Sequence, residues 1–244
     1  MHRFLLPPEA CRGDAVMLDE ADSHHAARVL RLNPGDALEV LDGAGTRLAC
    51  RLATVGRRAV TAAVEARVTT PAEPFAVTLA LALLKGRALD YAIQKATELG
   101  ARVIQPLAAE RCVAQVAPDD LPAKLAGWRA TAAEACKQCG NPWLPEIRVP
   151  RTVPELAPAG AGTLLVASLE PGGRRVADAL AGRPAAVTVC LGPEGDFTPA
   201  EYAALRAAGA LPVTLGPHVL RADTAAITAL ALTLDALRAG PALR

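Results

Sequence analysis

From residue 76 onward the chain alternates short apolar runs with amphipathic segments. The apolar runs predict buried strands at 76–84, 103–106, 163–167, 187–191 and 213–215. The amphipathic segments predict helices at 88–99, 121–138 and 224–237, and Gly100 follows the first of them as a left-handed helix cap. Such an alternation is typical of an α/β domain with a mostly parallel sheet covered by helices.

The first seventy residues have a different pattern, with alternating positions and frequent turns. It predicts strands at 37–41, 47–54 and 59–68, and one helical piece between the turns that Ser23 caps. A compact barrel-like module fits this pattern best. Two prolines in the segment 70–74 predict an extended linker, so we expect one domain over 1–71 and a second over 72–244.

Composition narrows the class of protein. Hydrophobic residues make up 52% and charged residues 21% of 244, which favours a folded core over disorder. The formal net charge of +1 does not indicate a protein that coats nucleic acid in general. No apolar run reaches about 18 residues and the start does not resemble a signal peptide, so we expect no membrane span.

Six scattered cysteines indicate reduced thiols, and with the absence of a signal they predict a cytoplasmic protein. Cys136 and Cys139 form a C-x-x-C, but it has no second pair and lies in a helical pattern. We therefore predict no metal site.

The clearest candidate site is a pair of glycine-proline loops at 191–197 and 215–221. Each follows an apolar run and precedes a helical segment, which places both at the carboxyl ends of parallel strands, where open α/β sheets bind ligands. Neither loop is a dinucleotide fingerprint or a phosphate loop, so a small-molecule pocket built from backbone groups is expected. The alternative is an ordinary tight turn into a helix that Thr198 and Glu201 begin with a capping box. The charged groups of the second loop favour the ligand pocket over the ordinary turn, because unpaired charges are costly to bury in a core.

Two basic groups of residues are candidates for phosphate contacts. Lys85 follows the first strand of the second domain, Lys95 lies in the predicted helix that comes next, and Arg28 and Arg31 are about one helical turn apart in the first domain. The competing interpretation is a solvated helix face whose charges balance those of nearby acidic residues.

Four segments together resemble the 16S ribosomal RNA (uracil-N3) methyltransferase family, a branch of the SPOUT superfamily. They span nearly the whole chain in the family's order: His25-Ala-Ala-Arg28-Val-Leu-Arg31; Ile93-Gln-Lys95-Ala-Thr-Glu98-Leu-Gly100; Glu110-Arg111-Cys112 with Glu134-Ala-Cys136-Lys-Gln-Cys139-Gly140 and Pro145-Glu146-Ile147; and the two Leu-Gly-Pro loops. Each is weak alone, and the ordered set is specific.

This resemblance implies an N-terminal PUA-like β-barrel that binds RNA and a C-terminal α/β domain with a trefoil knot and helices on both faces of its sheet. It implies S-adenosylmethionine as cofactor, a homodimer, and 16S ribosomal RNA of the small subunit as substrate. The cofactor contacts carried over are Leu191, Gly192, Glu194, Gly195, Leu215, Gly216, Leu220, Arg221 and Thr224. The candidate RNA contacts are Arg3, Arg28, Arg31, Lys85 and Lys95.

The chemistry of uracil N3 suggests roles for three charged residues. This nitrogen carries a proton at neutral pH, so the enzyme must remove it or stabilise the anion as the methyl group arrives. Arg221 is expected to stabilise charge on the uracil oxygens, and Glu194 or Asp223 to accept the proton if burial raises the pKa of its carboxyl.

Three positions depart from the family pattern. Asp196 stands where the second glycine of Gly-Pro-Glu-Gly-Gly is usual, and His218 stands where an arginine usually follows the second Gly-Pro. Asn141 replaces an arginine that commonly follows the Gln-Cys stretch, and the loss of that arginine bears on RNA contact.

Two other function classes stay open. A related SPOUT enzyme would methylate ribose 2′-hydroxyls or transfer RNA, and a non-catalytic protein would bind RNA without S-adenosylmethionine. A nicotinamide oxidoreductase is disfavoured because no strand–turn–helix carries the glycine fingerprint.

Overall fold

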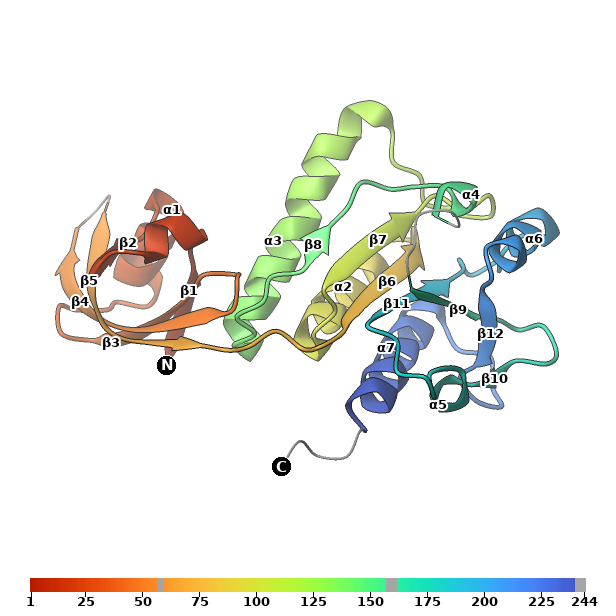
Figure 1. The fold of residues 1–244 in the computed structure, drawn as a ribbon. Helices are drawn as coiled ribbons and strands as arrows, with labels where there is room; N and C mark the ends of the chain where they lie inside the picture. Colours follow the sequence, from red (N-terminus) through yellow and green to blue (C-terminus); the bar gives the residue numbers. More distant parts are fainter. Residues whose placement is uncertain (57–58, 157–161, 240–244) are drawn as a thin grey trace. The chain divides into compact units, whose positions relative to one another are not determined.

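Residues 1–56, 59–156 and 162–239 are described by the structure, which is a computed structural model (Figure 1). The chain divides into two units. The first contains residues 1–72 and 133–144, and the second contains residues 73–132 and 145 onward. Thus a short stretch far along the sequence belongs with the N-terminal unit.

A five-stranded mixed sheet forms the first unit, in the order β1-β3-β4-β5-β2. β1 pairs parallel with β3, and the remaining pairs are antiparallel. The strands are β1 (His2–Leu5), β2 (Ala15–Met17), β3 (Ala37–Leu41), β4 (Thr46–Val55) and β5 (Val60–Thr69). The three strands expected from the alternating pattern are confirmed, with ends that differ by at most one residue. β1 and β2 are too short for that pattern to reveal.

The helical piece of this unit begins earlier than the sequence suggests. Helix α1 (Glu20–His24) is capped by Asp19, whose side chain accepts a hydrogen bond from the Asp22 backbone N at 2.7 Å. Ser23 instead lies buried, where its Oγ donates to Leu18 O and accepts from Val60 N. The prediction of Ser23 as the cap is therefore wrong, because Asp19 already satisfies the free N–H group at the helix start.

Seven parallel strands form the sheet of the second unit, in the order β10-β12-β9-β11-β6-β7-β8. The strands are β6 (Ala76–Ala82), β7 (Val103–Leu107), β8 (Glu146–Ile147), β9 (Thr163–Ala167), β10 (Arg174–Arg175), β11 (Ala186–Leu191) and β12 (Leu211–Thr214). Successive residues of β6 point to opposite faces, and Leu79, Ala80 and Leu81 are all at most 1% exposed. Both faces of the central strands are therefore covered, and the predicted α/β fold is confirmed.

Within the described residues, the second unit contains the three helices that the amphipathic pattern predicts, the helix that the capping box begins, and two four-residue helices that were not predicted. They are α2 (Ala88–Leu99), α3 (Leu121–Cys139, which continues into the first unit), α4 (Val153–Leu156), α5 (Val176–Ala179), α6 (Pro199–Ala207) and α7 (Ala222–Arg238). Short 3-10 turns lie at η1 (Pro8–Cys11) and η3 (Pro118–Asp120), and a π-helical turn, η2 (His25–Val29), follows α1. α7 packs against α2 and against β6 and β11. Gly100 ends α2 with φ 101°, the left-handed cap that its position predicts.

Strand order determines which loops meet. β9 lies between β11 and β12, and all three strands run in the same direction, so the segments that follow them share one edge of the sheet (Figure 1). The trefoil knot that the family resemblance implies concerns how the chain threads, and it stays a prediction. In the described part of the chain, no helix is long and apolar enough to cross a membrane.

Candidate functional site

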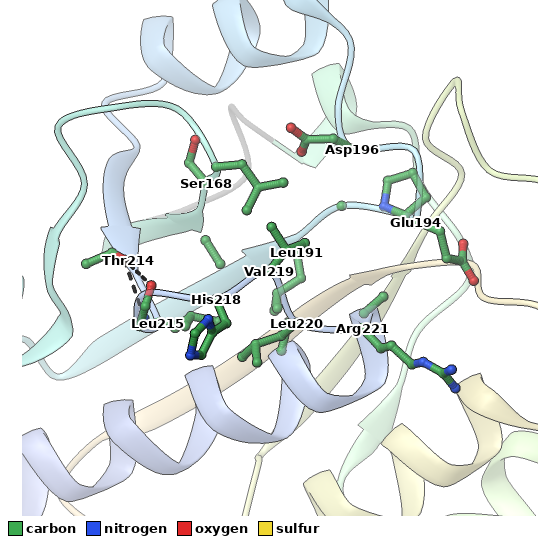
Figure 2. A pocket seen from close by; sticks show the side chains of 17 residues that line it. Ser168, Leu191, Glu194, Asp196, Thr214, Leu215, His218, Val219, Leu220 and Arg221 are labelled. Carbon is green, nitrogen blue, oxygen red and sulfur yellow. Dashed lines mark hydrogen bonds between the residues drawn. The ribbon is translucent and has the colours of Figure 1, made fainter.

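The segments after β9, β11 and β12 enclose a cavity of about 340 Å³ in the second unit (Figure 2). Its walls also include the first residues of α7. The lining residues are Ala167, Ser168, Leu169, Leu191, Gly192, Pro193, Glu194, Asp196, Thr214, Leu215, Gly216, His218, Val219, Leu220, Arg221, Ala222 and Ala225. The two glycine-proline loops predicted to form a pocket thus line one cavity, and a third loop joins them.

The first glycine-proline loop is held from both ends. Thr198 caps α6 in the expected capping box, and Glu201 closes the box. Glu201 is only 2% exposed, and its second oxygen accepts a hydrogen bond from the Glu110 backbone N at 2.9 Å. The Arg111 Nη1 atom donates to Gly195 O at 3.0 Å. These bonds tie the loop to the segment that follows β7.

Two glycines permit the shape of the loops. A Cβ at Gly192 would lie 3.3 Å from the backbone N of Phe197 and 3.4 Å from Oδ1 of Asp196, closer than the loop accepts without moving. Gly216 has φ 141°, a conformation that side chains of L-residues rarely adopt. Both positions therefore keep the backbone at the cavity free of side chains.

The cavity has an apolar wall and a charged side. Leu191, Leu215 and Leu220 form the wall, which suits a flat aromatic ring. Glu194 and Arg221 lie together on the side opposite Ser168 and Thr214 (Figure 2), and both side chains are exposed. An acidic and a basic group are thus available where a second substrate can reach.

Most of the predicted cofactor contacts line this cavity, and three of the residues predicted as cofactor contacts or catalytic groups do not. The predicted contacts that line the cavity are Leu191, Gly192, Glu194, Leu215, Gly216, Leu220 and Arg221. Gly195, Asp223 and Thr224 lie outside the lining. The carboxylate of Asp223 accepts a hydrogen bond from the backbone N of Thr224 at 2.7 Å, within the first turn of α7.

Sequence reasoning missed the third loop. Ser168 and Leu169 follow β9 directly, and the rule that placed the other two loops at the sheet edge applies to them equally. Asp196 and His218 belong to the two predicted loops but were singled out only as departures from a family pattern and not as ligand contacts; both line the cavity.

Cys190, which directly precedes the cavity-lining Leu191, is a packing residue. Cys190 precedes the last residue of β11 and is fully buried. Burial raises the pKa of its thiol, so it stays neutral and unreactive at physiological pH. In the residues that the structure describes, no group of three or more His, Cys, Asp or Glu side chains is arranged to hold a metal ion.

The basic residues proposed for RNA contact differ in how they are engaged. Arg28 and Arg31 are exposed and line a separate cavity of about 370 Å³ in the first unit, where Arg31 adopts a left-handed φ of 54°. Arg3 pairs with Glu39 at 2.6 Å and donates to the carbonyl of Gln138 near the end of α3.

The two candidate lysines lie in the second unit. Lys95 pairs with Glu98 at 2.7 Å and lies over the ring of Tyr91. Lys85 is exposed in the loop after β6. Arg28, Arg31 and Lys85 thus present their charge to solvent most openly, whereas Arg3 and Lys95 also hold local structure.

Comparison with known proteins covers both units. Residues 71–234 match the family described as RNA methyltransferase domain, and residues 18–65 match the family described as RNA methyltransferase PUA domain. A protein of Mycobacterium tuberculosis named ribosomal RNA small subunit methyltransferase E is 34% identical over 223 residues, which cover 89% of this chain and 85% of that protein.

Solved structures share the fold over most of the chain. The structure of a ribosomal RNA small subunit methyltransferase E from Neisseria gonorrhoeae bound to S-adenosyl methionine superposes with a TM-score of 0.88 at 29% identity, covering 96% of this chain and 97% of that one. A protein from Legionella pneumophila, solved in complex with the bound cofactor SAM, superposes with a TM-score of 0.85 at 30% identity, and the match covers 96% of each chain.

Proposed function

Because this chain belongs to the RNA methyltransferase family whose relatives are named ribosomal RNA small subunit methyltransferase E, we propose that it methylates N3 of a uracil in 16S ribosomal RNA, with S-adenosylmethionine as the methyl donor. The observation that carries the proposal is the cavity at the ends of β9, β11 and β12, with its apolar wall beside Glu194 and Arg221.

The cavity residues fit S-adenosylmethionine. The leucine wall matches the adenine ring, and an added Cβ at Gly216 meets no protein atom within 4 Å, so the loop leaves room at that point. Two carboxylates, Glu194 and Asp196, line the cavity and complement a ligand with a net positive charge. When bound, this cofactor supplies a methyl group on a positively charged sulfur.

Arg221 is positioned to act on the acceptor base. It is the N-cap residue of α7, and its exposed side chain extends from the cavity on the same side as Glu194 (Figure 2). Its guanidinium stabilises the negative charge that develops on the uracil oxygens as N3 attacks. N3 lies on the Watson–Crick edge of the base, so the target uracil leaves any stack to reach this site.

Glu194 is the better placed of the two proposed proton acceptors. Its carboxylate lines the cavity, whereas that of Asp223 is engaged with Thr224 outside it. Glu194 is exposed in the free chain, so docking of the RNA must supply the desolvation that makes a carboxylate a stronger base. We therefore assign proton removal to Glu194 and a supporting electrostatic role to Asp223.

The first unit is proposed to hold the RNA. It matches a PUA domain of RNA methyltransferases over residues 18–65, and Arg28 and Arg31 line its cavity. Together with Arg3, Lys85 and Lys95 these residues would contact phosphates, which position the RNA without reading its sequence. We further propose a cytoplasmic homodimer that acts on the small ribosomal subunit.

The decisive experiment is methyl transfer from radiolabelled S-adenosylmethionine to small ribosomal subunits that lack the family modification, followed by mass spectrometry of digested nucleosides. A single 3-methyluridine in 16S ribosomal RNA is the expected product. A methyl group on a ribose 2′-hydroxyl or in transfer RNA would replace the proposal with the related enzyme class. RNA binding without binding of the cofactor would indicate a non-catalytic protein.

A further inference from the structure

A chain of hydrogen bonds crosses one wall of the cofactor cavity. The backbone N of Glu170 donates to Ser168 Oγ at 3.0 Å, and Ser168 Oγ donates to the hydroxyl of Tyr202 at 3.3 Å. The Tyr202 hydroxyl donates to Oδ1 of Asp196 at 2.8 Å. The chain therefore links the loop after β9 to the loop after β11 through α6, and Ser168 and Asp196 both line the cavity (Figure 2).

Asp196 occupies its place at a conformational cost. Its φ is 62°, in the left-handed region that favours glycine, although aspartate tolerates this region better than most residues. Its Oδ1 also accepts a hydrogen bond from the backbone N of Phe197 at 2.8 Å. Gly192 leaves room for the same oxygen, since a Cβ there would lie 3.4 Å from it. The loop is thus built closely around this carboxylate.

Tyr202 fixes the direction of the network. It is 5% exposed, and its ring meets that of Phe197 edge to face at 5.6 Å. Burial raises the pKa of the Tyr202 hydroxyl, and the hydrogen bond to Asp196 raises it further. The hydroxyl therefore keeps its proton and always acts as donor toward Asp196.

One oxygen of Asp196 remains available to a ligand. Oδ1 takes both donated hydrogen bonds, and no other residue in the described part of the chain donates to Oδ2. A half-buried carboxylate oxygen at a cavity gains most from a donor that also carries positive charge. S-adenosylmethionine has one cationic N–H donor, the ammonium of its methionine portion. Its hydroxyls are neutral donors and its sulfonium has no N–H or O–H.

We propose that Oδ2 of Asp196 binds the ammonium of the cofactor's methionine portion, and that Tyr202 and Ser168 are positioning residues that hold this carboxylate in place. The proposal rests on the proposed use of S-adenosylmethionine and is independent of which RNA atom is methylated. It gives this chain a cofactor contact at the position where a glycine is usual in the family that its sequence resembles.

Isothermal titration calorimetry with three ligands tests the assignment. S-adenosylmethionine and S-adenosylhomocysteine both carry the ammonium, and 5′-methylthioadenosine lacks the whole amino-acid portion. Asp196→Asn keeps an acceptor at Oδ1 and removes the charge. It is expected to weaken binding of the first two ligands about tenfold and to leave binding of the third unchanged, because a hydrogen bond between charged groups is stronger than one between neutral groups. Asp178→Asn, at an exposed position of α5 outside the cavity, is the matched carboxylate control and should leave the affinity for all three ligands unchanged.

Substitutions at Tyr202 separate positioning from packing. Tyr202→Phe keeps the ring contact with Phe197 and removes the hydroxyl donor. It should therefore lower the affinity for the two ligands that carry the ammonium roughly threefold, as expected for the loss of one hydrogen bond. Added to Asp196→Asn it should cause little further loss, because it acts through that carboxylate. Ser168→Ala should have a smaller effect in the same direction. Tyr91→Phe, at an exposed tyrosine of α2, is the control.

A glycine at position 196 distinguishes binding from folding. Asp196→Gly removes the left-handed strain together with the carboxylate and its hydrogen bonds to Phe197 and Tyr202, so the two effects oppose each other and urea unfolding should show only a small change in stability. The ammonium ligands should bind as weakly as to Asp196→Asn. Equal losses for all three ligands, or unchanged binding of S-adenosylmethionine to Asp196→Asn, would overturn the proposal. A loss confined to S-adenosylmethionine would place the carboxylate at the sulfonium instead. A wild-type chain that binds none of the three would refute the cofactor assignment itself.

Discussion

The two cavities that carry the proposed function differ in how they are built. The cavity of the second unit is formed by backbone loops at the ends of β9, β11 and β12, with leucines on one wall and glycines where the chain turns. The cavity of the first unit is lined by Arg28 and Arg31 beside a π-helical turn and the turn that follows it. A reaction centre needs atoms fixed by a rigid sheet, whereas attraction to phosphates tolerates exposed and adjustable cations. Substitutions in the cavity of the second unit should therefore act on chemistry or on cofactor affinity, and substitutions in the cavity of the first unit should act on RNA affinity.

Arg221→Ala is expected to have the largest effect. Loss of the charge that stabilises the uracil anion should lower kcat by about 100-fold, with cofactor affinity changed only slightly, as for removal of one oxyanion donor. Single-turnover methylation of small subunits gives the rate, and calorimetry gives the affinity. Arg221→Lys, which keeps the charge but not the geometry, should recover part of the rate. Intact turnover with weakened cofactor binding would exclude the catalytic role.

Gly216→Ala should have its main effect on cofactor affinity. At φ 141° a Cβ is strained whatever the space around it, so the second glycine-proline loop must shift. A strain of roughly 1–3 kcal/mol, released by moving the loop, would weaken S-adenosylmethionine binding by about tenfold or more. Calorimetry measures the loss. Gly209→Ala, also at positive φ but outside the cavity, is the control, since it should reduce stability and leave affinity unchanged.

The double variant Arg28→Ala with Arg31→Ala should change only the interaction with RNA. Each lost phosphate contact is expected to weaken RNA binding several-fold and to reduce the salt slope by roughly 0.7–0.9. Filter binding at a series of salt concentrations measures both quantities. Cofactor affinity should match that of the wild type. An unchanged salt slope would remove these two arginines from the RNA surface.

Thr198→Ala should have the smallest effect and no specificity for either cavity. It removes the N-cap hydrogen bond of α6 and leaves Glu201 with its bond to Glu110. The expected loss is about 1 kcal/mol of unfolding free energy, measured by urea titration. Cofactor affinity should fall by less than about threefold if the bonds of Glu201 and Arg111 keep the loop in place. A much larger loss would show that the cap itself orders the site.

The sheet of the second unit was largely predictable because each of its longer strands coincides with an apolar run in the sequence. β9 has the predicted bounds, and α2 matches its helical pattern from Ala88 to the left-handed Gly100. The two-residue strands β8 and β10 had no such signal, since two residues carry no period. Ser23 shows the other kind of failure, in which two possible caps compete and a tertiary bond to Val60 N decides between them.

The site was predictable where it depends on strand ends and not where it depends on strand order. The glycine-proline loops can be recognised in the sequence by their motifs. Only the strand order β12-β9-β11 brings Ser168 between them. Asp223 and Thr224 follow Arg221 closely in sequence, yet neither lines the cavity that Arg221 lines, and the Asp223 carboxylate instead accepts a hydrogen bond from the Thr224 backbone N.

The sequence by itself determined the class of fold, the two glycine-proline loops and the family, because hydrophobic periods, turn residues and motif spacing are local properties of a chain. Tertiary structure alone decided which groups face one another: the hydrogen bonds from Ser168 through Tyr202 to Asp196, and the tie between Arg111 and Gly195. Those contacts join residues up to 84 positions apart. Their geometry follows from how parallel strands are ordered in the sheet, and no local pattern encodes that order.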